Sequence, residues 1–159
     1  MQYRRITPAD DAAIAKLVRD NLKKHGLDIP GTVYFDTNLD HISDFYLEKP
    51  EKRDYFVVTD EGGVVIGGIG LAEFEPFAGC TELQKLYLSE AAKGKRLGYD
   101  MLRLIEDRAR ELGYQKAYLE THTNLAAAIH IYEKCGYREI PKPEEVVHSG
   151  MNRFYSKEL

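Results

Sequence analysis

The sequence predicts a single α/β domain over residues 1–159, with a mixed, mostly antiparallel central sheet of about six to seven strands flanked by about four helices. Three strand-like segments, at residues 55–59, 64–74 and 80–88, follow one another with only short turn signals between them. This spacing indicates an antiparallel meander. Downstream, helical and strand patterns alternate, which indicates βαβ units with a crossover helix.

The N-terminal part is predicted to hold one strand and two helices. Thr7 offers an N-cap, Pro8 suits the first helical position, and Asp10 completes a capping box. Apolar residues then recur at helical spacing, and a second helix is expected to stop before Pro50. The predicted elements are a strand over 2–6, a helix over 8–24, an aromatic loop over 27–37 and a helix over 39–48.

The C-terminal part alternates between helices and strands. An apolar stripe runs from Leu97 to Leu112 at helical spacing, and Gly113 supplies the stop. The elements predicted after this helix are a strand over 116–121, a helix over 124–135, a strand over 137–140, a loop over 141–150 and a strand over 151–156.

Composition narrows the functional classes. The net charge of −4 and the pI near 5.8 argue against nucleic acid as the main partner. No apolar run approaches the roughly 18 residues of a membrane span, and the N-terminus lacks the apolar stretch of a signal peptide. Cys80 and Cys135 do not have metal-ligand spacing, so we expect reduced thiols, a cytoplasmic protein and no metal site.

The segment from Lys85 to Leu102 is the most informative part of the chain. It is predicted to form a strand, a loop and the start of a helix, and we call residues 93–98 of it the basic glycine loop. Unpaired N–H groups and the helix macrodipole would favour an anion there. Lys93, Lys95 and Arg96 add positive charge, so a phosphate or pyrophosphate is expected on residues 94–98. The spacing of Gly94 and Gly98 does not fit a P-loop.

Together with the segment from Glu120 to Tyr137, this region resembles the acetyl-CoA-binding motifs of the GNAT superfamily of N-acetyltransferases. The basic glycine loop is similar to that family's Q/R-x-x-G-x-G/A loop, and the later segment to its N-x-x-A-x-x-x-Y-x-K-x-G-F/Y helix. The resemblance covers roughly residues 55–140. It implies the GNAT fold, acetyl-CoA as cofactor and transfer of the acetyl group to an amine.

The sequence departs from these motifs at three positions. Lys93 stands where the family prefers Gln or Arg, and Arg96 replaces the first motif glycine, which is compatible with pyrophosphate binding if φ is negative there. Asn124 lies one residue further from Tyr132 than is usual. The resemblance implies that pantetheine pairs with the backbone of Leu86 and Leu88 like an added strand. The cofactor-binding residues expected in total are Leu86, Tyr87, Leu88, Lys93, Gly94, Lys95, Arg96, Leu97, Gly98, Tyr99, Asn124, Ala128, Tyr132 and Lys134.

Acetyl transfer from a thioester to an amine needs a proton acceptor for the amine and benefits from a proton donor for the thiolate. Tyr132 is the candidate acid, because Ala128 lies four residues earlier on the same helix face and leaves room for a thioester. Glu82 is the candidate base, directly or through water. Strict alternation would place Glu82 on one strand face with Gln84, Leu86 and Leu88. Glu120 is the competing base or an amine-binding group.

The acceptor is expected to be a primary amine of a small molecule, entering between the upstream end of the 80–88 strand and the aromatic loop. Asp36, Asp40, Glu82 and Glu120 would favour a cationic acceptor. Three alternatives stay open: a non-catalytic acyl-CoA sensor, a protein or peptide acetyltransferase, and an acetyl-cysteine route through Cys80 or Cys135. A homodimer is also possible on this sequence. The substrate-binding candidates are Glu120, Gln84, Tyr34, His122 and His148.

Overall fold

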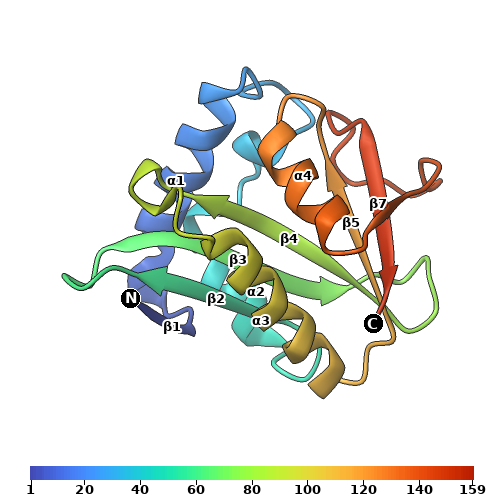
Figure 1. The fold of residues 1–159 in the computed structure, drawn as a ribbon, viewed down its shortest axis with the longest axis horizontal. Coiled ribbons are helices and arrows are strands. Elements are labelled where there is room, and N and C mark those ends of the chain that lie inside the picture. Colours follow the sequence, from blue (N-terminus) through green and yellow to red (C-terminus); the bar gives the residue numbers. More distant parts are fainter.

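The computed structural model describes all 159 residues as a seven-stranded sheet with helices on both faces (Figure 1). The strand order is β1-β2-β3-β4-β5-β7-β6. Only β4 and β5 pair in parallel, so the sheet is mixed and mostly antiparallel, as predicted. The strands are β1 (Gln2–Arg5), β2 (Asp54–Thr59), β3 (Val65–Glu73), β4 (Cys80–Leu88), β5 (Lys116–Thr121), β6 (Arg138–Glu139) and β7 (Arg153–Glu158).

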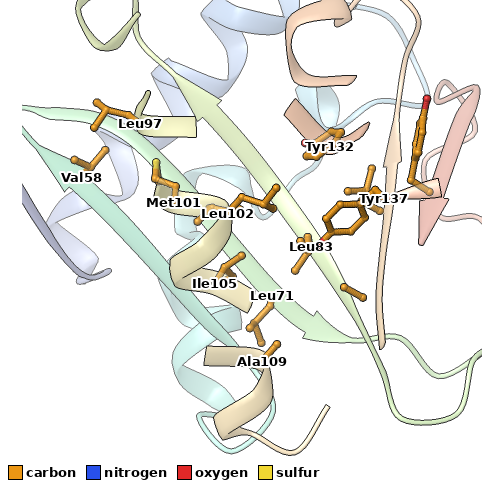
Figure 2. Packing of buried hydrophobic residues seen from close by; sticks show 14 of the residues in the cluster. Val58, Leu71, Leu83, Leu97, Met101, Leu102, Ile105, Ala109, Tyr132 and Tyr137 are labelled. Atoms are coloured by element: carbon orange, nitrogen blue, oxygen red, sulfur yellow. The ribbon is translucent and has the colours of Figure 1, made fainter. Parts of the chain in front are cut away.

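The four α-helices divide between the two faces. On one face, α3 and α4 cover a core in which Leu83, Met101 and Tyr132 are buried (Figure 2). On the other face, α1 and α2 cover a second core that contains Tyr46 and Tyr55. No helix is long and apolar enough to cross a bilayer. The helices are α1 (Asp11–Lys24), α2 (Ile42–Glu48), α3 (Leu97–Glu111) and α4 (Ala126–Lys134).

Local signals account for most element boundaries. The predicted capping box is present: Thr7 N–H donates to Asp10 Oδ2 at 2.8 Å. The predicted helix over 8–24 begins as a short 3₁₀ turn, and the one over 39–48 is likewise a 3₁₀ turn followed by α2. The last two strands differ more from expectation, because β6 has only two residues and β7 begins two residues later than predicted. β6 is too short to carry a periodic signal, and the bounds of β7 are set by its pairing with β5 and β6 on either side.

The glycines of β3 make room for buried tyrosines. A β-carbon at Gly68 would lie 2.3 Å from Tyr55 Oη, and one at Gly70 would lie 2.5 Å from Tyr55 Cδ2. Tyr55 is fully buried and passes over this stretch of β3 to donate its hydroxyl to the Lys85 carbonyl of β4 at 3.1 Å. The glycines of β3 therefore leave space for Tyr55, and the Tyr55 hydroxyl in turn fixes the Lys85 carbonyl of β4.

That contact falls on a β-bulge. In the β3–β4 ladder Gly70 pairs with Gln84 but Gly68 pairs with Tyr87, so β4 has one extra residue. Lys85 sits there with φ of 53°, in the left-handed region. The bulge shifts the alternation of side chains by one residue.

Consequently, the prediction that Glu82 and Gln84 share a face with Leu86 and Leu88 is wrong. Leu86 and Leu88 pack on the α3 side, together with Leu83. Gln84 accepts a hydrogen bond from Tyr46 on the opposite, α1–α2 side, and Tyr87 packs there as well. The strand therefore presents polar side chains to one face and leucines to the other as it approaches the basic glycine loop.

Candidate active site

A cavity of about 590 Å³ lies where β4 and β5 diverge. The two strands pair only from Cys80 to Glu82 on β4, and beyond that point they separate (Figure 1). The basic glycine loop and the start of α3 line one end of the cavity, and Glu82, Glu120 and His148 line the other. The C-terminal turn of α1 and one face of α4 complete the walls.

Most residues predicted for the site meet in this cavity. Five do not line it: Lys95, Asn124, Lys134, Tyr34 and His122. The predicted residues that line it are Glu82, Gln84, Leu86, Tyr87, Leu88, Lys93, Gly94, Arg96, Leu97, Gly98, Tyr99, Glu120, Ala128, Tyr132 and His148.

The residues outside the cavity have other contacts. Asn124 Nδ2 donates to the His25 carbonyl at 2.9 Å, and its N–H donates to His122 Nδ1 at 3.0 Å, which ties the β5–α4 connection to the end of α1. Lys95 lines a separate shallow hollow beside Met1 and residues 60–62. The ring of Tyr34 packs edge-on against Phe35.

The basic glycine loop presents a row of free backbone donors. The N–H groups of residues 94–98 make no hydrogen bond to the protein, because α3 begins at Leu97 and Tyr99 is the first residue to donate back to Arg96. Such a helix start attracts anions. The Lys93 ammonium group donates a hydrogen bond to the Glu90 carboxylate at 2.8 Å. The guanidinium of Arg96 lies 5.2 Å from the centre of the Tyr99 ring.

The condition of a negative φ at Arg96 is not met, because φ there is 59°. Gly94, two residues earlier, has φ of 74°. A β-carbon in the left-handed region costs about 1 kcal/mol. The loop therefore adopts a turn that favours glycine even though arginine occupies the position. Gly98 lies against α4, since a β-carbon there would be 2.7 Å from Ile131 Cδ1.

The end of β4 has a backbone edge that faces the cavity. Ser89 N–H donates to Ile66 of β3 at 2.8 Å, and neighbouring amides of a strand point in opposite directions, so Leu88 N–H points away from β3. The Leu88 carbonyl accepts from Asn21 Nδ2 at 3.2 Å. Asn21 was missed at the sequence level, where it is one polar residue in the helix over 8–24.

Tyr132 places a free hydroxyl in the cavity. Its side chain is 8% exposed, and its ring packs at 6.0 Å from that of Tyr137 (Figure 2). The hydroxyl has no hydrogen-bond partner in the protein, and burial raises its pKa well above the ordinary value for tyrosine. The group is therefore a protonated donor that faces the cavity without competition from another acceptor.

Two carboxylates lie on one face of adjacent strands at the other end. Glu82 on β4 pairs in register with Tyr118 on β5, and Tyr118 donates its hydroxyl to Glu120 Oε2 at 2.8 Å. Gln84 Nε2 donates to Glu82 Oε1 at 3.3 Å. Burial, followed by repulsion from Glu120, raises the pKa of Glu82 to about 7. Such a carboxyl group can exchange a proton near neutral pH.

His148 connects this end of the cavity to the aromatic loop. Its Nε2 lies 2.9 Å from Asp36 Oδ2, and its Nδ1 lies 3.8 Å from Glu120 Oε1. Hydrogen bonding with Asp36, followed by the interaction with Glu120, raises the pKa of His148 to about 9. The imidazolium thus holds the loops of residues 27–37 and 141–150 together over the carboxylates. No group of three or more His, Cys, Asp or Glu side chains is arranged to hold a metal ion.

The sequence matches a known family over most of its length. Residues 20–137 match the model of the acetyltransferase (GNAT) family, so the chain belongs to that family. The prediction of an N-acetyltransferase is confirmed at the level of enzyme class. The family match runs from the last turns of α1 to just beyond α4 and includes every residue that lines the cavity except His148 and Met151.

Individual relatives agree with this assignment. The chain is 37% identical over 142 residues to the uncharacterized N-acetyltransferase YjgM of Escherichia coli K12, covering 86% of this chain and 81% of YjgM. Its fold is similar to that of an acetyltransferase of the GNAT family from Staphylococcus aureus Mu50, with a TM-score of 0.84, 17% identity and coverage of 99% and 98% of the two chains. It is also similar to PaiA N-acetyltransferase from Thermoplasma acidophilum, solved with coenzyme A, with a TM-score of 0.77, 16% identity and coverage of 99% and 98%.

The raised pKa of Glu82 predicts a pH-dependent cost to folding. In the unfolded chain this carboxyl group loses its proton near pH 4.5, whereas in the folded protein it does so near pH 7. Wild-type stability therefore falls as pH rises between these values and the cost is constant above them. The stability of Glu82→Gln relative to wild type should therefore increase by on the order of 1–3 kcal/mol as pH rises from 4 to 8. Denaturant unfolding at each pH would measure this difference.

Glu145→Gln is the matched control, because Glu145 is exposed and makes no hydrogen bond. Its stability relative to wild type should stay constant over the same pH range. A Glu82→Gln difference that is equally flat would contradict the buried, charge-coupled environment assigned to Glu82.

Proposed function

We propose that this protein transfers the acetyl group of acetyl-CoA to the primary amine of a small molecule, directly and within a ternary complex. One observation carries the proposal. A single cavity is lined by an anion-binding helix start, a free strand edge, a free tyrosine hydroxyl and a buried carboxylate pair. Family membership and the coenzyme A complex of PaiA support the choice of donor.

The cofactor end would bind acetyl-CoA mainly through backbone groups. The five unpaired N–H groups of residues 94–98 suit a pyrophosphate, with Arg96 and Lys93 adding charge. The edge of Leu88 suits the amides of pantetheine, which would extend along β4 towards Tyr132. Ala128 lines the cavity beside Tyr132 and leaves space for the thioester.

The acceptor end would deprotonate and hold the amine. Glu82, as the carboxylate, accepts a proton from the bound ammonium, and the free amine then attacks the thioester carbonyl. The carbon–sulfur bond breaks, and Tyr132 donates its proton to the departing thiolate. The acetylated nitrogen then releases its second proton to the tyrosinate, which leaves a neutral amide and restores Tyr132. Glu120 and the paired Asp36–His148 would orient the amine. A buried base with a pKa near 7 suits this role at physiological pH.

The cysteines do not favour an acetyl-enzyme route. Neither Cys80 nor Cys135 lines the cavity. Cys80 is buried, and burial raises its pKa to about 12, so its thiolate is scarce at neutral pH. A non-catalytic acyl-CoA sensor would bind the cofactor in the same way, and only turnover distinguishes it from an enzyme. A screen of small amines, amino acids and peptides for acetyl-CoA-dependent thiol release tests this directly.

The placement of the phosphates predicts a loss of affinity when charge is removed from the basic glycine loop. The double variant Lys93→Ala/Arg96→Ala should bind acetyl-CoA more weakly by about 1–4 kcal/mol, because charge-assisted contacts are lost. Isothermal titration would measure this, and wild-type affinity should also fall as salt is added. Lys95→Ala is the control, since Lys95 lies outside the cavity and should leave affinity unchanged. Equal losses in the two variants would refute the placement.

The acid and base assignments predict separable kinetic effects. Tyr132→Phe removes only the hydroxyl, so acetyl-CoA affinity should hold while kcat falls by about 10²-fold. Glu82→Gln should abolish the acidic limb of kcat/KM, which in wild type should have its midpoint near pH 7. That limb should persist in Tyr132→Phe.

Tyr114→Phe serves as the control for loss of a phenol, because its hydroxyl bonds to the Lys52 carbonyl away from the cavity. It should keep the wild-type kcat. An acidic limb that survives in Glu82→Gln and disappears in Glu120→Gln would transfer the base role to Glu120.

A further inference from the structure

Lys85 is a cation inside the acceptor end of the cavity that the catalytic scheme does not use. It occupies the bulge of β4 and lines the cavity beside Glu82 and Gln84. Its ammonium lies on the α2 side of the sheet, 5.9 Å from the centre of the Tyr46 ring. The Tyr55 hydroxyl holds its carbonyl, so the backbone position of this lysine is fixed from the core.

Lys85 differs from its charged neighbours because it has no partner. Gln84 donates to Glu82, Tyr118 donates to Glu120, and Asp36 pairs with His148. Lys85 makes neither a hydrogen bond through its ammonium nor an ion pair, although it is only partly exposed. Burial lowers the pKa of Lys85, and the carboxylates of Asp36 and Glu82 offset this only in part because neither contacts the ammonium group.

The cofactor phosphates are too far away to be that counter-ion. Lys85 lies four residues before Ser89, at which β4 has ended, and a strand rises about 3.3 Å per residue. The α-carbon of Lys85 is therefore on the order of 13 Å from the end of the strand, and its ammonium group lies towards Tyr46 rather than towards the basic glycine loop. The Glu82 carboxylate lines the same cavity and is close enough to act electrostatically on Lys85, although it forms no ion pair with it.

We propose that Lys85 binds the carboxylate of the acceptor, and that the acceptor is an amino acid or another small amine that carries a carboxylate. This inference rests on the proposed acetyl transfer to an amine and narrows its substrate class. The acceptor end then recognises both charges of a zwitterion: Glu82 and Glu120 take the ammonium group, and Lys85 takes the carboxylate. The incoming carboxylate supplies the missing counter-ion and offsets the desolvation of the lysine.

The test compares matched acceptors and then a variant. Wild-type enzyme is assayed by acetyl-CoA-dependent thiol release with a panel of free amino acids and the corresponding amino-acid carboxamides, which keep the amine and lose the negative charge. The free acids should be preferred in kcat/KM by about 10- to 100-fold, as expected for one charge-assisted contact. This comparison needs no substitution and therefore does not depend on how a variant folds.

Lys85→Met removes the charge but keeps the length and the β-carbon, so the backbone cost at a φ of 53° is unchanged. It should raise KM for the preferred acid by about 10- to 100-fold and leave KM for its carboxamide and for acetyl-CoA unchanged. Lys85→Arg should recover much of the loss. Lys52→Met is the control, because the Lys52 side chain is exposed, makes no hydrogen bond and lies outside the cavity, and it should behave as wild type.

The outcomes separate this inference from the proposed function. The role of Lys85 would be overturned if free acids and carboxamides supported thiol release at equal rates and Lys85→Met changed both rates alike. The acetyltransferase proposal would then remain intact. A fall in kcat for both acceptor types would make Lys85 a proton-transfer group and also overturn it. Tight acetyl-CoA binding with no thiol release for any amine would overturn both.

Discussion

The hydrogen bond from Tyr55 to the Lys85 carbonyl is the constraint on which the site depends. Tyr55 is fully buried and reaches β4 only because Gly68 and Gly70 leave space above β3. The bond coincides with the bulge, where Lys85 adopts a left-handed conformation that a non-glycine residue takes at a cost of about 1 kcal/mol. The surrounding core over-determines this conformation, since the tyrosine cannot move without losing its packing.

Two properties of the cavity follow from the bulge. It turns Tyr87 onto the same face as Gln84 while Leu86 and Leu88 return to the α3 core. It also falls where β4 has already ceased to pair with β5, so the edge beyond it is open. The cofactor half of the site therefore consists largely of backbone donors, which depend little on side-chain identity. In the proposed reaction the acceptor half consists of side chains, and their charges would determine which amine fits.

Much of this architecture could be predicted from the sequence. Periodicity, caps and glycine stops place all four helices and the meander, and the basic glycine loop is recognisable because its cations precede an amphipathic helix. The bulge could not be predicted, because it depends on Tyr55 and Gly68, which are distant in sequence from Lys85. The same holds for the bond of Asn21 to Leu88 and the pairing of His148 with Asp36. The conformation of Arg96 was also missed, since its φ is imposed by the loop and opposes the residue's own preference.

The central claim is that the open edge of β4 and the start of α3 together bind one extended cofactor. Backbone amide hydrogen exchange, measured residue by residue with and without acetyl-CoA, tests it most directly. Exchange should slow at Leu88 and at residues 94–98 together, while amides of the β5–β7 ladder far from the cavity change little. Protection of residues 94–98 without protection of Leu88, or protection at neither place despite tight binding, would contradict it.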